Sequence, residues 1–543
     1  MYSGFDDPGR WVLPAVLAEQ AERRPDARWI ETTTGERASF SRLNEDVERA
    51  AACFASLGVA PGDHVAVMLP NGLDLVRAWL GLGRLGAVAV MLNTELTGAF
   101  LRHPLADCGA ALAVVDATLM PAFLEASHDV PAIARVLVAG DAPPAPSRPG
   151  LAMLAWDAWR DAPRHAGPMP RAQDIACVMY TSGTSGPAKG VLMPHAHCFL
   201  YGRGAIDSLE LTADDVYYIV LPLFHANGLL MQLAATLIAG CSAIVRPRFS
   251  ASAWLDDVRR HGATATNCLG ALAAFLIATP PTPHDRDHRL RVVKNAPNLA
   301  EHEAVFRERF GVPDVTSGFG MTEVNIPTWG RLGESLPGTA GRVYDRFFEM
   351  VIADPETDRP VAAGELGEIL VRPKVPFGFM AGYHGRAQQT VEAWRNLWFH
   401  TGDAGTLSAD GVLTFVDRIK DCIRRRGENL SATEIESAFA TLAGVAEVAA
   451  YAVPSDIRGG EDEVMLAVVP APGAQPTPQQ VADHAERTLP RFARPRYVSV
   501  IDALPKTATG KVQRALLRKR GAEGAWDATT ASTASASVPT GAR

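Results

Sequence analysis

The sequence predicts an α/β protein in which helices cover largely parallel β-sheets. Through residues 1–330, short apolar runs typical of strands, such as 64–69, alternate with longer runs typical of helices, such as 43–57. This alternation indicates helices layered on parallel strands. From 341 to 416 the pattern changes to short strands separated by turns. We therefore expect a β-rich subdomain at about 341–419.

The chain length predicts more than one domain, because 543 residues exceed what a single hydrophobic core supports. Residues 1–419 are expected to form a large N-terminal domain, with two layered α/β subdomains followed by the β-rich one. Residues 420–520 mix helix and strand patterns, which predicts a small α+β C-terminal domain. Residues 521–543 are rich in Ala, Ser, Thr and Gly, a composition typical of a disordered tail.

Composition and charge exclude several classes of protein. The net charge of −8 argues against a nucleic-acid partner, which usually requires a basic surface. Seven cysteines lie far apart without a C-x-x-C pair, as expected for free thiols in a reducing cytosol. The longest apolar stretch, 228–245, contains Gln232, Gly240 and Ser242, so we expect a buried helix followed by a strand and no membrane span. These observations predict a cytoplasmic protein.

The first chemical motif lies between Tyr180 and Gly190 and follows a strand-like run. It reads Thr181, Ser182, Gly183, Thr184, Ser185, Gly186, Pro187, Ala188, Lys189. Its glycines allow the backbone to approach an anion, and its hydroxyls, amides and Lys189 can bind phosphate oxygens. It is not the P-loop of kinases and GTPases, because Lys189 is followed by glycine and the spacing differs.

Five further motifs follow in order: Leu221–Gly228, Phe319–Glu323, Thr401–Asp403, Asp417–Asp421 and Leu504–Lys511. Together with the first, they resemble the motifs of the adenylate-forming superfamily, which contains acyl-CoA synthetases, luciferases and the adenylation domains of peptide synthetases. The resemblance covers about residues 10–515. Each motif alone is weak, but six in the same order are specific. The resemblance implies a ligase that uses ATP to convert a carboxylic acid to acyl-AMP and then to acyl-CoA, with a C-terminal domain that is mobile.

The resemblance also implies an ATP site with Mg²⁺ bound at Glu323. Thr322 is expected at the α-phosphate, Phe319 on the adenine, and Asp403 and Arg418 at the ribose. The remaining ATP-binding residues are expected to be Thr181–Gly186, Lys189, Asn295, Ala296, Pro297, Gly318, Gly320 and Met321. Phe319 replaces the usual tyrosine but keeps a stacking face. Lys294 and Asn295 stand where many relatives have two glycines.

Lys511 is the residue that the resemblance places between the carboxylate and the α-phosphate. A cation suits that place, because the reaction joins two anions. Lys420 is expected to be the hinge about which the C-terminal domain rotates for the second step. Arg424, Arg426 and Gly427 are then expected at coenzyme A, with the glycine leaving room for the pantetheine arm. The acyl pocket is expected to contain His225, which we also count as catalytic, together with Asn227, Gly228, Asn267, Gly270, Ala271 and Gly318.

Two other functions share some of these features. A free-standing enzyme that loads a carrier protein would have the same catalytic residues, so the motifs do not exclude it. A nucleotide-binding protein that has lost catalysis should have lost Lys189, Glu323, Asp403 or Lys511, and all four are present. The variant Gly427-Glu428-Asn429 is similar to that of carnitine- and bile-acid-type CoA ligases. The acid is left open, and we expect a monomer or a homodimer.

Overall fold

The computed structural model describes most of the chain and confirms the predicted α/β class. The residues outside the description are 142–147, 182–186, 356, 419–421, 426–427, 440, 458–460, 506–511, 513 and 531–543. The side chains of 270, 271, 417, 418, 422, 429, 431, 433 and 515 are also outside it. The chain divides into two compact units. The first contains Met1–Thr94, Pro104–Tyr180 and Gly190–Ile419, and the second contains Glu95–His103, Thr181–Lys189 and Lys420–Arg543.

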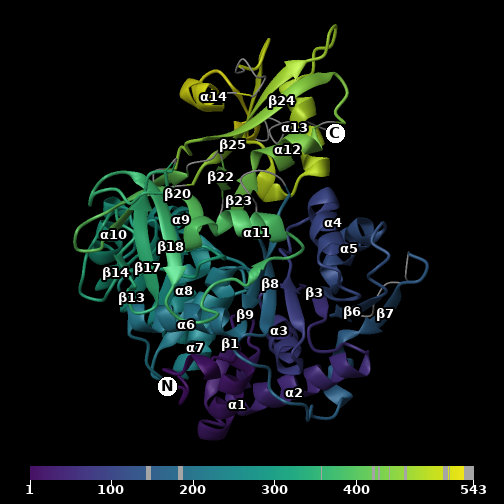
Figure 1. The fold of residues 1–543 in the computed structure, drawn as a ribbon, viewed down its shortest axis with the longest axis vertical. Coiled ribbons are helices and arrows are strands. Elements are labelled where there is room, and N and C mark those ends of the chain that lie inside the picture. The colour runs from purple at the N-terminus through teal and green to yellow at the C-terminus, as the bar shows by residue number, and fades with distance from the viewer. Residues whose placement is uncertain are drawn as a thin grey trace, which may run out of the picture. The chain divides into compact units, whose positions relative to one another are not determined.

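A mostly parallel sheet carries the first half of unit 1. Its strands, in spatial order, are β19 (Gly382–Tyr383), β9 (Lys189–Pro194), β8 (Ile175–Thr181), β4 (Val88–Met91), β3 (His64–Met68), β5 (Leu112–Asp116), β6 (Arg135–Ala139) and β7 (Ala152–Ala155). Helices α2 (Phe40–Ser56) and α3 (Leu73–Leu85) lie side by side (Figure 1). Helix α3 is buried at nearly every position and ends at Gly86, whose φ of 81° favours glycine. This burial explains why most of its sequence is apolar, and its buried Arg77 and Arg84 pair with Asp46 and Glu48.

The second sheet carries most of the predicted site. Its order is β14 (Asp314–Thr316), β13 (Val292–Ala296), β12 (Ala265–Leu269), β10 (Val216–Ile219), β11 (Ser242–Val245), β1 (Arg28–Thr32) and β2 (Arg37–Ser39). All neighbours except β1 and β2 are parallel. Helices α8 (Ala251–His261) and α10 (Ala300–Glu308) pack on the face that bears Tyr218 and Val293. The opposite face, with Tyr217 and Val292, belongs to the main core.

The stretch 228–245 is buried, as predicted. It forms a π-helix (η4, Asn227–Ala234), helix α7 (Ala235–Ala239) and strand β11. In the described part of the chain, no helix is both long enough and apolar enough to cross a membrane. Helices α1 (Leu13–Arg23) and α6 (His195–Leu209) pack against α7. This packing accounts for the continuous apolar sequence there.

An antiparallel sheet completes unit 1: β17 (Phe348–Ala353), β18 (Gly367–Pro373), β20 (Phe399–Leu407) and β21 (Leu413–Arg418). It corresponds to the β-rich pattern read from the sequence. In unit 2 a second small sheet contains β24 (Val445–Val453), β25 (Glu463–Pro470), β26 (Tyr497–Val500) and β27 (Trp526–Asp527). The other elements of unit 2 include β22 (Cys422–Arg425), β23 (Glu428–Ser431), α12 (Ala432–Ala438), α13 (Pro478–Thr488) and α14 (Arg514–Arg520).

Strand β27 corrects the prediction of a disordered tail from residue 521 onward. Tyr497 and Val498 pair with Asp527 and Trp526. Trp526 packs against the hydrophobic core of unit 2, and Arg496 donates a hydrogen bond to Asp527. One tryptophan buries enough apolar area to order a short segment, and the composition of the whole tail hid this signal.

Helix α6 gives the fold a predicted dependence on pH. His195 is 1% exposed, and neither ring nitrogen has a hydrogen-bond partner among the described residues. Burial lowers the pKa of His195 to about 4, against 6.5 in an exposed histidine. Unfolding therefore takes up a proton between these pH values, so this contribution to stability is complete above about pH 6.5 and is lost as the pH falls towards 4.

We expect the melting temperature of His195→Leu to fall less between pH 7 and pH 5 than that of the wild type. Thermal unfolding followed by circular dichroism at both pH values measures this difference. The variant removes only this titration, because the carboxylates of the fold are unchanged. Equal losses in the two proteins would show that the pKa of His195 is the same in the folded and unfolded states.

Candidate active site

The candidate residues of unit 1 follow the carboxyl ends of four parallel strands that are neighbours in the sheet. His225, Asn227 and Gly228 come after β10, and Gly270 and Ala271 follow β12. Ala296 ends β13 and precedes Pro297, while Gly318–Glu323 follow β14. In open α/β sheets, ligands bind at this edge, outside the carboxyl ends of the strands. The topology therefore places residues from separate motifs where such a sheet forms its site.

Segment 318–323 is held in place by the side chains of helix α6. The Tyr201 hydroxyl donates to the Met321 carbonyl at 2.5 Å, and the His197 Nε2 lies 2.9 Å from the Thr322 carbonyl. Gly320 is required by space, since a Cβ there would lie 2.5 Å from the Asn325 carbonyl oxygen. Neither His197 nor Tyr201 was singled out in the sequence. Their helix lies more than one hundred residues from the motif that it supports, so no local pattern could have revealed them.

Glu323 presents a buried carboxylate, which is 5% exposed. The Tyr383 hydroxyl donates to its Oε1 at 3.0 Å, and the Met380 amide donates to its backbone carbonyl at 3.0 Å. No cluster of three metal-ligating side chains occurs among the described residues. This donor set suits Mg²⁺ bound to ATP, because that ion uses one or two carboxylates and takes its other ligands from phosphates and water.

The residues expected at the nucleoside lie on or near the antiparallel sheet. Asp403 is buried on β20, directly opposite Arg418 of β21. The Phe319 ring lies 6.2 Å from the Phe415 ring, at an angle of 25°. Phe415 belongs to the same strand as Arg418. This sheet therefore brings the expected ribose-binding residues and one neighbour of the expected adenine-binding ring together in unit 1.

The motif Leu221–Gly228, which follows β10, is anchored by Asn71, a residue for which the sequence predicted no role. The Asn71 side chain donates to the Leu221 carbonyl and accepts from the Leu223 amide, at 3.0 and 2.7 Å. Gly228 lies where a Cβ would be 2.3 Å from the Pro222 carbonyl oxygen, so this turn requires glycine. Asn267 donates to Asn227 at 2.8 Å, which joins two of the predicted pocket residues.

The other predicted residues are described in part. Thr181 ends β8, Lys189 begins β9, and the Asn295 side chain donates to the Pro297 carbonyl at 3.1 Å. Arg424 on β22 pairs with Glu461 at 3.2 Å. Ser182–Gly186, Lys420, Arg426, Gly427 and Lys511 lie outside the described residues, as do the side chains of Ala271 and Arg418. Their assignments stay predictions.

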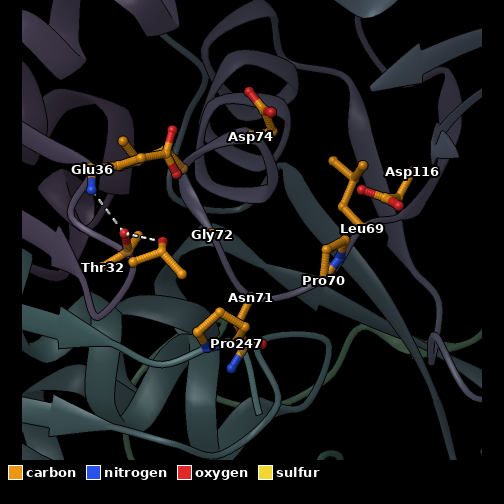
Figure 2. A pocket seen from close by; sticks show the side chains of 11 residues that line it. Thr32, Glu36, Leu69, Pro70, Asn71, Gly72, Asp74, Asp116 and Pro247 are labelled. Atoms are coloured by element: carbon orange, nitrogen blue, oxygen red, sulfur yellow. Dashed lines mark hydrogen bonds between the residues drawn. The ribbon is translucent and has the colours of Figure 1, made fainter. Parts of the chain in front are cut away.

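A separate cavity of about 180 Å³ lies at the end of β3 in unit 1 (Figure 2). Figure 2 shows Glu36, Asp74 and Asp116 around it, and it contains none of the predicted site residues. Three carboxylates repel a triphosphate. The acidic lining of this cavity therefore argues against it as the nucleotide site.

Comparisons with known proteins agree with the motifs. The family model of AMP-binding enzymes matches residues 17–384, and the model of the AMP-binding enzyme C-terminal domain matches residues 434–511. A crotonobetaine/carnitine–CoA ligase from Salmonella heidelberg (strain SL476) is 31% identical over 484 residues, which is 87% of this chain and 92% of the relative.

Solved structures of similar fold include ATP-bound MatB from Rhodopseudomonas palustris. It is 27% identical with a TM-score of 0.68, covering 93% of this chain and 98% of that one. The o-succinylbenzoate CoA synthetase of Bacillus subtilis is 25% identical with a TM-score of 0.79, covering 94% of this chain and 99% of that one. Together with the fold, these matches identify the protein. The chain belongs to the family of AMP-binding enzymes, and within it to the adenylate-forming acyl-CoA ligases, which use ATP to convert a carboxylic acid to acyl-AMP and then to acyl-CoA.

Proposed function

We propose that this chain carries out both half-reactions with the residues assigned above, and that Glu323 is the centre of its ATP site. The observation that supports this most is the geometry of segment 318–323. Its carbonyls are held by His197 and Tyr201, and its carboxylate is buried against Tyr383. A rigid buried carboxylate at the carboxyl edge of a parallel sheet suits a bound nucleotide.

In the first half-reaction, a carboxylate oxygen of the acid attacks the α-phosphorus of ATP and pyrophosphate leaves. Thr181–Gly186 and Lys189 bind the phosphates, Thr322 donates to the α-phosphate, and Asp403 accepts from the ribose hydroxyls. Glu323 would hold Mg²⁺, which would neutralise charge on the phosphates. Lys511 stabilises the charge that develops between acid and phosphate.

In the second half-reaction, the thiol of coenzyme A attacks the acyl carbonyl and AMP leaves. We assign residues 1–419 to the nucleotide-binding domain and 420–520 to a mobile domain that turns about Lys420. This turn removes Lys511 and brings Arg424, Arg426 and Gly427 to the thiol. The similarity to CoA ligases over nearly the whole chain supports coenzyme A as the acceptor.

Replacing Glu323 tests the proposed ATP site. We expect Glu323→Gln to lower kcat/KM for MgATP roughly tenfold or more and to raise the Mg²⁺ concentration needed for half-maximal pyrophosphate release, because the amide is a weaker ligand of a hard cation. Tyr383→Phe keeps the carboxylate and removes one hydrogen bond, so its effect should be smaller and in the same direction.

Pyrophosphate release across a Mg²⁺ titration gives both quantities for the two variants and the wild type. Circular dichroism shows whether Glu323→Gln keeps the fold, as expected for a substitution of equal size. An unchanged Mg²⁺ dependence in the folded variant would remove Glu323 from the site.

A further inference from the structure

Lys294 on β13 is a buried lysine without a counter-charge in the described part of the chain. It is 3% exposed, and its one hydrogen bond among the described residues runs from Nζ to the Ser317 carbonyl at 3.4 Å. Burial lowers the pKa of Lys294 to about 8, so the ammonium keeps most of its charge at pH 7. A buried ammonium has three donors and is costly without acceptors. The fold therefore retains a cation whose partner is missing from the described part of the protein.

The neighbours of Lys294 in the sheet are also polar. Asn267 of β12 and Thr316 of β14 are its register partners, and partners in parallel strands extend their side chains from the same face. The Thr316 hydroxyl is buried without a partner among the described residues. Tyr217 and Asn227 complete the hydrogen bonds of Asn267, at 2.5 and 2.8 Å. Lys294 and Thr316 are thus left with donors free for a ligand.

The ammonium lies against the start of the catalytic segment. A Cβ on Gly318 would be 3.2 Å from the Lys294 Nζ and 2.8 Å from the Thr328 carbonyl oxygen. Gly318 leads directly into Phe319–Glu323, and Asn227 and Asn267 belong to the expected acyl pocket. Lys294 is therefore next to residues expected to contact the acyl group and carries a charge opposite to that of a carboxylate.

We propose that Lys294, assisted by Thr316, binds a second carboxylate on the acyl part of the acid, and so selects dicarboxylic acids. This inference rests on the proposed function, because it concerns the substrate of the same site. A carboxylate supplies the missing counter-charge and accepts several hydrogen bonds at once. Acids with a quaternary ammonium, such as carnitine, would meet a like charge there and are expected to be poor substrates.

Matched acids test the proposal. Straight-chain dicarboxylic acids of four to ten carbons are compared with the monocarboxylic acids of equal length and with 4-(trimethylammonio)butanoate. Activity is measured as steady-state pyrophosphate release in the presence of saturating coenzyme A, so that the enzyme turns over. We expect the best dicarboxylic acid to exceed its monocarboxylic match by roughly tenfold or more in kcat/KM. Lys294→Met should remove that preference, while its KM for ATP stays within about twofold of the wild type.

Three further variants make the test specific. Lys294→Arg should keep part of the preference, Thr316→Val should reduce it, and Lys374→Met, an exposed lysine on the surface, should leave it unchanged. The proposal fails if the wild type prefers monocarboxylic or cationic acids. It also fails if Lys294→Met lowers kcat/KM by the same factor for every acid. If Lys294→Met does not fold, Thr316→Val decides in the same way. Failure of the proposed function looks different: no acid would release pyrophosphate with any of these proteins.

Discussion

Lys511→Ala should lower acyl-AMP formation by roughly a hundredfold or more, and it should leave the transfer from supplied acyl-AMP to coenzyme A within a few-fold of the wild type. The first half-reaction places two anions together, and one positioned cation lost from such a transition state typically costs this much. In the second half-reaction a thiol attacks the acyl carbonyl of the mixed anhydride and AMP leaves, and Lys511 has by then moved away. Pyrophosphate release measures the first step, and acyl-CoA formation from synthetic acyl-AMP measures the second.

Lys519→Ala is the matched control for this experiment. Lys519 is an exposed lysine on α14, eight residues after Lys511, and we assign it no role. Its replacement should leave both half-reactions unchanged. If Lys511→Ala reduced both steps together, Lys511 would not belong to the first step alone, and a defect of the whole C-terminal domain would be the better explanation.

Gly427→Leu should impair the second half-reaction and spare the first, the opposite of the effect expected for Lys511→Ala. If Gly427 lines the path of the pantetheine arm, a leucine side chain blocks the thiol by its bulk, and acyl-CoA output should fall by roughly a hundredfold. The ATP site is untouched, so acyl-AMP should still form and should remain bound to the enzyme. Single-turnover reactions with radiolabelled ATP, quenched with and without coenzyme A, show whether acyl-AMP accumulates.

Gly427→Ala gives a graded comparison, because one methyl group should cause a smaller loss than leucine. An equal loss of acyl-AMP formation and acyl-CoA output in Gly427→Leu would contradict the assignment of Gly427 to the thiol path. Arg424, which lies on β22 and pairs with Glu461, offers a second position for comparison.

Most of the fold could be predicted because parallel strands leave a clear pattern. The buried stretch 228–245 and strand β3 match their predicted positions, since apolar length and flanking turns define them locally. Strand β27 could not be predicted, because it depends on one tryptophan that packs on a distant core. The π-helical form of η4 also has no local signal, because the helical pattern is the same in both forms.

The site shows the same division. Glu323 and Gly318 could be found from motifs, since chemistry requires a carboxylate and close packing requires a glycine. Tyr383, His197 and Asn71 could not, because they support the site from elements distant in sequence. Lys294 was visible as a departure from the usual two glycines. Only the structure shows that the Lys294 ammonium is buried and lies beside Gly318.

This ligase activates an acid as acyl-AMP and passes it to coenzyme A. The most direct measurement incubates the wild-type enzyme with ATP, Mg²⁺ and a panel of mono- and dicarboxylic acids, with and without coenzyme A. It follows pyrophosphate, AMP and acyl-CoA together. We predict a stoichiometric burst of pyrophosphate without coenzyme A, and sustained release of AMP and acyl-CoA in equal amounts when it is present. Acyl-AMP formation that coenzyme A neither accelerates nor converts to acyl-CoA, for every acid in the panel, would contradict the account and favour a carrier protein as the acceptor.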